Sequence, residues 1–343
     1  MGYTKQYNFR QFIRQMFSVR QIKAQKFTCE APDEAEIRDA DIPVILKKQT
    51  GRDFVILNLT DLHYSDYDIR FFMSLCAERT IKRLVREVKP DLITVTGDTV
   101  CGKSGYFSLM RFIDMMEAFE TPWAPVFGNH DDETNCDLFY QAREMIKAPH
   151  CLMKPGNPEY GCGNYALTVK NETDTVEAVI MTDSKHGQMS ESLREWVVET
   201  GKKIGAKETA VMMHIPLPEY QTAYDEAWNK DKKRWNDGYG AFGEQHEKIA
   251  CQRDENGNPC YRGTLEKLKE IPSLKHILCG HEHLNNWSAV YNGVRLTYTL
   301  KVGAASGHRR QFNGGTVITV GDNGIKSVVH RTRRAKGFKN LYT

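Results

Sequence analysis

The sequence lacks several features that would assign it directly to a class of protein. It has no run of roughly 20 apolar residues, so no segment is expected to cross a membrane as a helix. Neither sign of charge dominates its 343 residues, because 47 Lys and Arg stand against 44 Asp and Glu. The overall charge therefore gives no case for binding duplex nucleic acid. The apolar share of 40% and the charged share of 27% are those of a folded globular chain.

The nine cysteines contain no C-x-x-C pair, which argues against a zinc ribbon and against a thioredoxin-type redox motif. Their number is odd, and many lie in apolar stretches, as buried free thiols do. The first residues are basic but lack the continuous apolar core of a signal peptide. We therefore expect free thiols in a reducing cytoplasm. Cys251 and Cys260 flank an Asn256-Gly257 turn, which leaves a pairing of these two open.

Strand and helix patterns alternate over the middle of the chain. Expected strands cover residues 54–59, 92–96, 123–127, 165–169, 176–182 and 209–213. Expected helices cover residues 71–88, 106–119, 138–146 and 193–198. This alternation indicates βαβ units and a largely parallel sheet. After residue 275 the pattern changes to a strand at 277–279 and two hairpins, around Asn292-Gly293 and Asp322-Asn323-Gly324, so the chain is expected to end in antiparallel strands.

Five of the expected strands are followed by side chains that can bind a metal ion. These motifs are Asp61-Leu62-His63, Gly97-Asp98, Gly128-Asn129-His130-Asp131, His214 and Gly280-His281-Glu282-His283. Ligands of open α/β sheets bind outside the carboxyl ends of the strands, so these side chains are expected to converge. Carboxylate, carboxamide and imidazole groups without a thiolate suit divalent Mn, Fe or Zn.

The expected ligand set is too large for one ion. Four imidazoles, two carboxylates and one carboxamide suffice for two ions if one carboxylate bridges them. Two ions about 3.5–4 Å apart can hold a bridging hydroxide and clamp a phosphoryl group for in-line attack. The glycines of the motifs are expected to permit tight turns. Each motif alone has an ordinary structural explanation, such as a turn or a core histidine, whereas all five in order indicate a site.

The ordered motifs resemble those of the calcineurin-like metallophosphoesterases. The resemblance implies an α/β fold, specifically a four-layer α/β/β/α sandwich with mixed sheets. It implies that one metal is held by Asp61, His63 and His283, that the other is held by Asn129, His214 and His281, and that Asp98 bridges both. It also implies that His130 touches the phosphoryl group and protonates the leaving oxygen, and that Asp131 orients His130.

Details of the motifs indicate which branch of that family the chain resembles. Protein Ser/Thr phosphatases carry an Arg after the second block and a Glu after Asn-His, and this chain has neither. Cys101 stands where true purple acid phosphatases have a ligand Tyr. Residues 214–220 and Gly163-Asn164-Tyr165 look like the purple-acid-phosphatase-like branch typified by Dcr-type phosphatases. We therefore expect a phosphomonoesterase of small phosphate esters. The alternatives are a phosphodiesterase of cyclic nucleotides or nucleotide diesters, and a metal-free scaffold, which the complete ligand set disfavours.

Three regions are expected along the chain: an extension at 1–50, a phosphoesterase domain at 51–330 with an insertion at about 216–262, and a basic tail at 331–343. The extension has a basic amphipathic segment followed by an acidic linker. Residues 1–26 have an apolar face beside Arg10 and Arg14, which would suit weak contact with an anionic membrane surface. Arg20 and Lys23 interrupt that face, so docking on the protein's own domain is preferred.

The insertion is rich in aromatic and basic residues and begins just after His214. Loops beside catalytic residues are often binding loops. We therefore expect its aromatic side chains to shape the pocket for the leaving group, and two arginines of a later loop to hold the phosphate. The residues assigned to substrate binding are Tyr220, Trp228, Trp235, Arg309 and Arg310.

Overall fold

The computed structural model describes residues 25–65, 69–102, 105–184, 189–229, 234–235, 238–240, 263–305, 312–334 and 337–340. The predictions for the amphipathic segment up to residue 24, for Cys251 and Cys260, and for Arg309 and Arg310 lie outside these residues. The side chain of Trp235 lies outside them too. Within the described ranges, no helix combines the length and the apolar character needed to cross a membrane.

The larger sheet has eight strands. In order they are β1 (Val44–Lys47), β5 (Tyr165–Lys170), β6 (Thr175–Met181), β7 (Glu208–Met212), β11 (Leu274–Cys279), β13 (Val294–Tyr298), β12 (Ser288–Tyr291) and β10 (Gly238–Tyr239). Neighbours from β6 to β13 run parallel, and so do β1 and β5. The pairs β5–β6, β13–β12 and β12–β10 are antiparallel, so the sheet is mixed.

The smaller sheet has six strands and is mixed as well. In order they are β16 (Gly337–Asn340), β15 (Gly324–Arg334), β14 (Gly314–Gly321), β2 (Phe54–Leu59), β3 (Leu92–Thr96) and β4 (Trp123–Val126). Strands β2, β3 and β4 are parallel, whereas β14, β15 and β16 pair antiparallel. The two mixed sheets confirm the sheets that the resemblance implied, whereas the alternation of strands and helices alone indicated a largely parallel sheet. A separate two-stranded ribbon joins β8 (Trp228–Asn229) to β9 (Arg234–Trp235).

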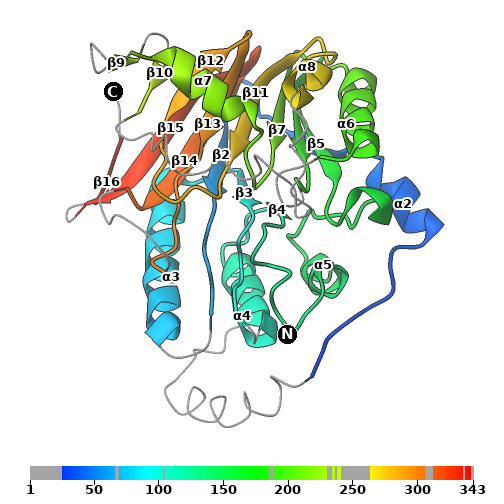
Figure 1. Cartoon of the computed structure of the whole chain (residues 1–343), viewed down its shortest axis with the longest axis vertical. Helices are drawn as coiled ribbons and strands as arrows, with labels where there is room; N and C mark the ends of the chain where they lie inside the picture. Colours follow the sequence, from blue (N-terminus) through cyan, green and yellow to red (C-terminus); the bar gives the residue numbers. More distant parts are fainter. Residues whose placement is uncertain are drawn as a thin grey trace.

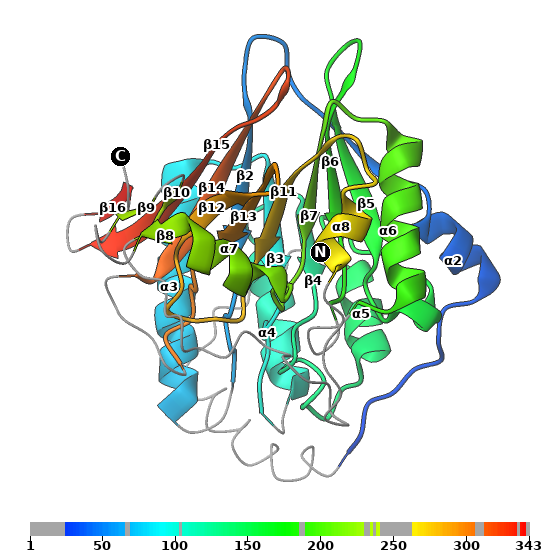
Figure 2. The same ribbon diagram turned by 45° about the horizontal axis from the view of Figure 1, so that its top comes forward.

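The two sheets pack face to face and helices cover both outer faces (Figures 1 and 2). The six-stranded sheet is covered by α3 (Ile69–Val88), α4 (Gly105–Glu117) and α5 (Leu138–Ile146). The eight-stranded sheet is covered by α6 (Glu191–Ile204), α7 (Glu219–Ala227) and α8 (Thr264–Leu268). This arrangement is the expected four-layer α/β/β/α sandwich. The central strand β3 is buried along its whole length, because a strand inside such a sandwich is covered on both faces.

The folded unit extends beyond both expected boundaries. Helix α2 (Glu34–Ala40) begins at a capping box formed by Asp33 and Glu36, and β1 then pairs with β5 at the sheet edge. Arg143 of α5 donates to Glu36 at 2.8 Å, and Trp196 of α6 donates to Asp41 at 2.9 Å. The expected linker before residue 50 is thus part of the domain. Strands β15 and β16 likewise carry the sheet to residue 340 within the expected basic tail.

Candidate metal centre

The carboxyl ends of β2, β3 and β11 bring one group of expected metal ligands together. Ligand atoms of Asp61, His63, Asp98 and His283 all lie within 4.8 Å of one another. The Nε2 atom of His63 is 3.0 Å from Nε2 of His283 and 3.5 Å from Oδ2 of Asp98. His283 Nε2 is 3.4 Å from Oδ1 of Asp61. This is the group that the sequence assigned to one metal together with the bridging carboxylate.

A second group of expected ligands also meets Asp98. His214 Nε2 is 3.3 Å from the same Oδ2 atom of Asp98. The Nδ1 atom of His281 is 2.9 Å from Oδ1 of Asn129, and the His281 ring stands edge-on to the ring of His214 at 5.2 Å. One carboxylate oxygen of Asp98 therefore faces a histidine of each group, which is the geometry that a bridging ligand needs.

The chemistry of these side chains fits bound divalent cations. The Nδ1 atom of His214 is 2.8 Å from the carbonyl oxygen of Thr96, so it carries the hydrogen and leaves the Nε2 lone pair facing Asp98. His214 Nε2 faces Asp98 Oδ2, and Asp61 Oδ1 faces His283 Nε2. Both His214 Nε2 and Asp61 Oδ1 are buried without a hydrogen-bond partner. Buried lone pairs that face one another are unfavourable unless a proton or a cation lies between them. A carbonyl that fixes the tautomer of the ring is also the usual support of a metal-binding histidine.

Four of the expected ligands are held in left-handed backbone conformations. The φ angles are 54° at Asp61, 50° at His63, 51° at Asp98 and 72° at His281. Such angles are uncommon for residues other than glycine, and residues in them cluster at functional sites. The backbone turns sharply after each strand and brings the side chain back over the sheet edge.

The motif glycines serve two different needs. Gly97 has a φ of 81°, which agrees with the expected tight turn. Gly128 and Gly280 are required for close approach instead. A Cβ atom at Gly128 would overlap the Asp98 carboxylate, and one at Gly280 would overlap the Thr60 hydroxyl.

The electrostatics of the site leave the lone pairs of two imidazoles available, those of His63 and His281. Burial, with the Lys301 charge, lowers the pKa of His63 to about 4. Burial, with the His214 charge, lowers the pKa of His281 to about 4. Both rings are therefore neutral at pH 7. Burial would also lower the pKa of His214, but the Asp98 carboxylate outweighs it and raises this pKa to about 9, so a metal ion would compete with that proton.

Asp131 does not orient His130 as expected. Its buried carboxylate accepts the backbone N–H groups of Val100 at 2.9 Å and Gly128 at 2.7 Å, which ties the turns after β3 and β4 together. Burial and the neighbouring Asp98 raise the pKa of Asp131 to about 7. His130 Nδ1 instead lies 2.8 Å from Glu133, three residues later in the same turn. Sequence reasoning missed Glu133, although an acid three residues after a histidine in a turn was a visible signal.

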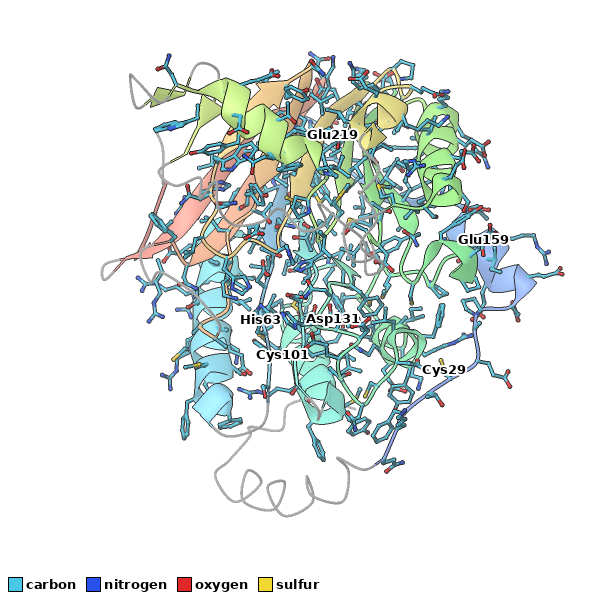
Figure 3. All side chains as sticks on the ribbon, in the orientation of Figure 1. Cys29, His63, Cys101, Asp131, Glu159 and Glu219 are labelled. Atoms are coloured by element: carbon cyan, nitrogen blue, oxygen red, sulfur yellow. The ribbon has the colours of Figure 1, made fainter. Side chains whose placement is uncertain are left out.

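Two further residues lie beside the centre (Figure 3 labels His63, Cys101 and Asp131). The Lys301 ammonium is buried and donates to the carbonyl oxygen of Asp61 at 3.0 Å. Burial lowers the pKa of Lys301 to about 8, against the opposing effect of the site carboxylates. The Cys101 thiol donates to the carbonyl oxygen of His63 at 3.5 Å, as a packed thiol would. No sequence motif marked Lys301, which reaches the site from the strand region after β13.

Among the described residues assigned to substrate binding, Tyr220 is not placed to contact a substrate. Tyr220 is fully buried in α7, and its hydroxyl donates to the carbonyl oxygen of Ile277 at 2.8 Å, so it is a core residue and not a substrate contact. The start of the expected insertion thus belongs to the helical layer. Trp228 is partly buried at the end of α7, where its backbone pairs with Trp235. Figure 3 shows Glu219, at the start of α7, far from His63.

Comparison with known proteins agrees with the fold and the motifs. The family model described as calcineurin-like phosphoesterase matches residues 54–285. The chain therefore belongs to the calcineurin-like phosphoesterase family. It is 23% identical to "Probable inactive purple acid phosphatase 14" of Arabidopsis thaliana, over 74% of this chain and 71% of that one. It is 26% identical to "Phosphatase DCR2" of Saccharomyces cerevisiae, over 61% of this chain and 39% of that one.

A solved structure has the same fold. Purple acid phosphatase PPD1 of yellow lupin, Lupinus luteus, superposes with a TM-score of 0.50 at 13% identity. The superposition covers 84% of this chain and 53% of the lupin protein. The similarity to purple-acid-phosphatase-like proteins and to DCR2 confirms the branch that the motifs indicated.

Proposed function

We propose that this chain is a phosphoesterase that depends on two divalent metal ions and hydrolyses small phosphate monoesters. The observation that carries the proposal is Asp98, whose Oδ2 atom lies 3.5 Å from His63 and 3.3 Å from His214. Each histidine belongs to a different ligand group, so a single carboxylate serves both positions. The family match and the relatives that are named phosphatases support the same reaction class.

The side chains suggest how the reaction is divided among them. Asp61, His63 and His283 would hold one ion, Asn129, His214 and His281 the other, and Asp98 would bridge. When bound, the ions supply positive charge that polarises a phosphoryl oxygen and lowers the pKa of an attacking water. His130 lies at the edge of the site, where Glu133 holds its Nδ1 atom and leaves Nε2 to give a proton to the leaving oxygen. Mn, Fe and Zn all suit this ligand set.

Metal analysis of an Asp98→Asn variant tests the proposal. Asn keeps an oxygen that can accept the backbone N–H of His130, now 2.9 Å from Oδ1, but removes the charge shared by both positions. We expect the metal content to fall from two ions per chain to one or none, and activity to fall at least about 100-fold. Asp174→Asn is the matched control, because that carboxylate pairs with Lys207 on the surface. Two ions retained in Asp98→Asn would contradict the bridging role.

A panel of substrates distinguishes a phosphomonoesterase from a phosphodiesterase. We expect the native protein to hydrolyse phenyl phosphate faster than bis(4-nitrophenyl) phosphate or a cyclic nucleotide. Faster hydrolysis of either diester would favour the phosphodiesterase alternative, and a native protein that binds no metal would favour the scaffold. We also propose a cytoplasmic location, which the free thiols of the described cysteines support.

A further inference from the structure

A cavity of about 240 Å³ adjoins the metal centre. Its wall includes Asn129, whose side-chain oxygen also faces His281, so the cavity lies against the second metal position. The rest of the wall comes from the turn after β4, the first turn of α5, the 3-10 helix η1 (Pro158–Tyr160) with the residues that follow it, and the turns after β6 and β7. Among the described residues of the wall, none belongs to α7.

The volume limits what this cavity can hold. An apolar cavity of about 150 Å³ accommodates a benzene molecule, whereas pockets for drug-sized ligands run from about 300 to 1,000 Å³. A space of about 240 Å³ therefore fits one six-membered ring with small substituents. A nucleoside or a peptide is larger than this space and would extend beyond it.

The chemistry of the wall is mainly apolar. Phe127, Leu138, Phe139 and Ile215 supply hydrocarbon and aromatic surface. The Ser184 hydroxyl accepts the backbone N–H of Ile215 at 2.9 Å, which leaves its hydrogen to donate to a bound molecule. The charged side chains of the described wall are carboxylates, from Asp132 and Asp183, and no Lys or Arg is among them. An additional negative charge on the leaving group would therefore be unfavourable.

Hydrogen bonds between the turns hold the wall in place. The Asn164 side-chain oxygen accepts the backbone N–H of Asp183 at 2.8 Å and the Thr182 hydroxyl at 3.0 Å. Asp183 in turn accepts the backbone N–H of Cys162 at 3.3 Å. Asn164 thus connects the residues after η1 to the turn after β6, so the cavity is formed before any ligand enters. A preformed cavity costs little ordering of the protein on binding.

We propose that this cavity receives the leaving group, and that the substrates are phosphate monoesters of a single-ring phenol or a similarly sized alcohol, uncharged or cationic. The proposal rests on the proposed function, because the phosphate must lie at the metal centre for the ring to reach the cavity. The burial of one ring would supply specificity, while the metal centre would bind the phosphoryl group that all phosphate esters share.

Calorimetry with two phosphonates tests the cavity without turnover. Phenylphosphonate and methylphosphonate carry the same charged group, and their C–P bonds are not substrates for ester hydrolysis. We expect the metal-loaded protein to bind phenylphosphonate at least about tenfold more tightly, because only the phenyl group buries apolar surface. Leu138→Trp should fill the cavity and remove this preference, while methylphosphonate binds as before. Phe139→Ala, which removes wall surface, should weaken the preference without filling the space.

Phe72→Ala is the matched control, because Phe72 is an exposed residue of α3 outside the described cavity wall, and it should leave both affinities unchanged. A kinetic series completes the test: phenyl phosphate should have a kcat/KM at least about tenfold above that of 4-carboxyphenyl phosphate. Equal affinities for the two phosphonates, or an equal loss of both in Leu138→Trp, would overturn the leaving-group assignment and leave the proposed function standing. If neither phosphonate binds and no ester is hydrolysed, the proposed function fails with it.

Discussion

His130 differs from the expected metal ligands around it in being open to solvent. Its side chain is 37% exposed, whereas the side chains of His63 and His214 are 1% and 0% exposed. Its backbone N–H is fixed by Asp98 and its ring by Glu133. Burial lowers the pKa of His130, but the Asp98 charge and the bond to Glu133 outweigh burial and raise it. A fixed and accessible imidazole with a raised pKa suits a proton donor to a leaving oxygen.

Replacing His130 by Asn should therefore affect substrates according to their leaving groups. An alkoxide needs a proton to leave, whereas a nitrophenolate with its low pKa scarcely does. We expect His130→Asn to lower kcat/KM for an alkyl phosphate by about 10²–10⁴-fold and for 4-nitrophenyl phosphate by far less. Steady-state kinetics with both esters measures this.

Glu133→Gln provides the companion to this experiment. The variant keeps a hydrogen-bond acceptor for His130 but loses the negative charge, so we expect a smaller loss with the same dependence on the leaving group. Equal losses on both esters in His130→Asn would mean that His130 acts only by positioning or by charge.

At the scale of elements, α7 shows how one helix can be misassigned from its composition. Its aromatic residues suggested a binding loop, yet Tyr220 and Tyr224 pack against Trp287, and Tyr220 also packs against Tyr298. The amino-acid types are the same for both roles, and the sequence contains no information on which face of the helix meets the sheet. Only the distant strands β12 and β13 decide it.

Tyr220→Phe tests whether Tyr220 is a core residue or a substrate contact. The change removes one buried hydroxyl and its hydrogen bond to Ile277. We expect it to lower the free energy of unfolding by about 1 kcal/mol while KM stays the same. Denaturant unfolding and kinetics on phenyl phosphate measure these two quantities. A raised KM with unchanged stability would instead restore Tyr220 as a substrate contact.

The strands that carry the metal ligands were predictable, because each is a buried apolar run that ends in a turn. The short edge strands β1 and β16 were not, since each depends on pairing with a partner far away in the sequence. Helix α6 was predicted too short, at 193–198. It runs from the Ser190 cap to Gly205, whose φ of 61° ends it, and the glycine inside it, Gly201, packs closely against Ile271.

For the whole molecule, histidines of the two sheets make the stability of the fold sensitive to acid. Burial lowers the pKa of the buried His330 on β15 and of the half-buried His276 on β11 to about 4 each. His330 Nδ1 is 3.1 Å from the Thr316 hydroxyl of the paired strand. Each of these histidines is therefore neutral in the fold at pH values where it is protonated in the unfolded chain.

The sign of that sensitivity follows from the pKa values. In the unfolded chain a histidine has a pKa of about 6.5, so between about pH 6.5 and 4 the unfolded state binds the extra proton. The free energy of unfolding should therefore fall as the pH falls through this window. Urea unfolding at several pH values should show a shallower dependence in His330→Asn than in the native chain. Identical pH profiles would contradict a neutral buried His330.

Glu219, at the start of α7, has a consequence for how this protein can vary in length. Its carboxylate accepts the backbone N–H of Gly263 at 2.6 Å, so the two ends of the segment between residues 219 and 263 are joined to each other. Helix α7 and the edge strand β10 tie the first part of this segment to the larger sheet. Doubling the length of a closed loop costs only about 0.6 kcal/mol of closure entropy. The sequence between β10 and α8 is therefore a position at which evolution or an engineer can add or remove residues at little entropic cost, while the strand ends around Asp98 keep their places.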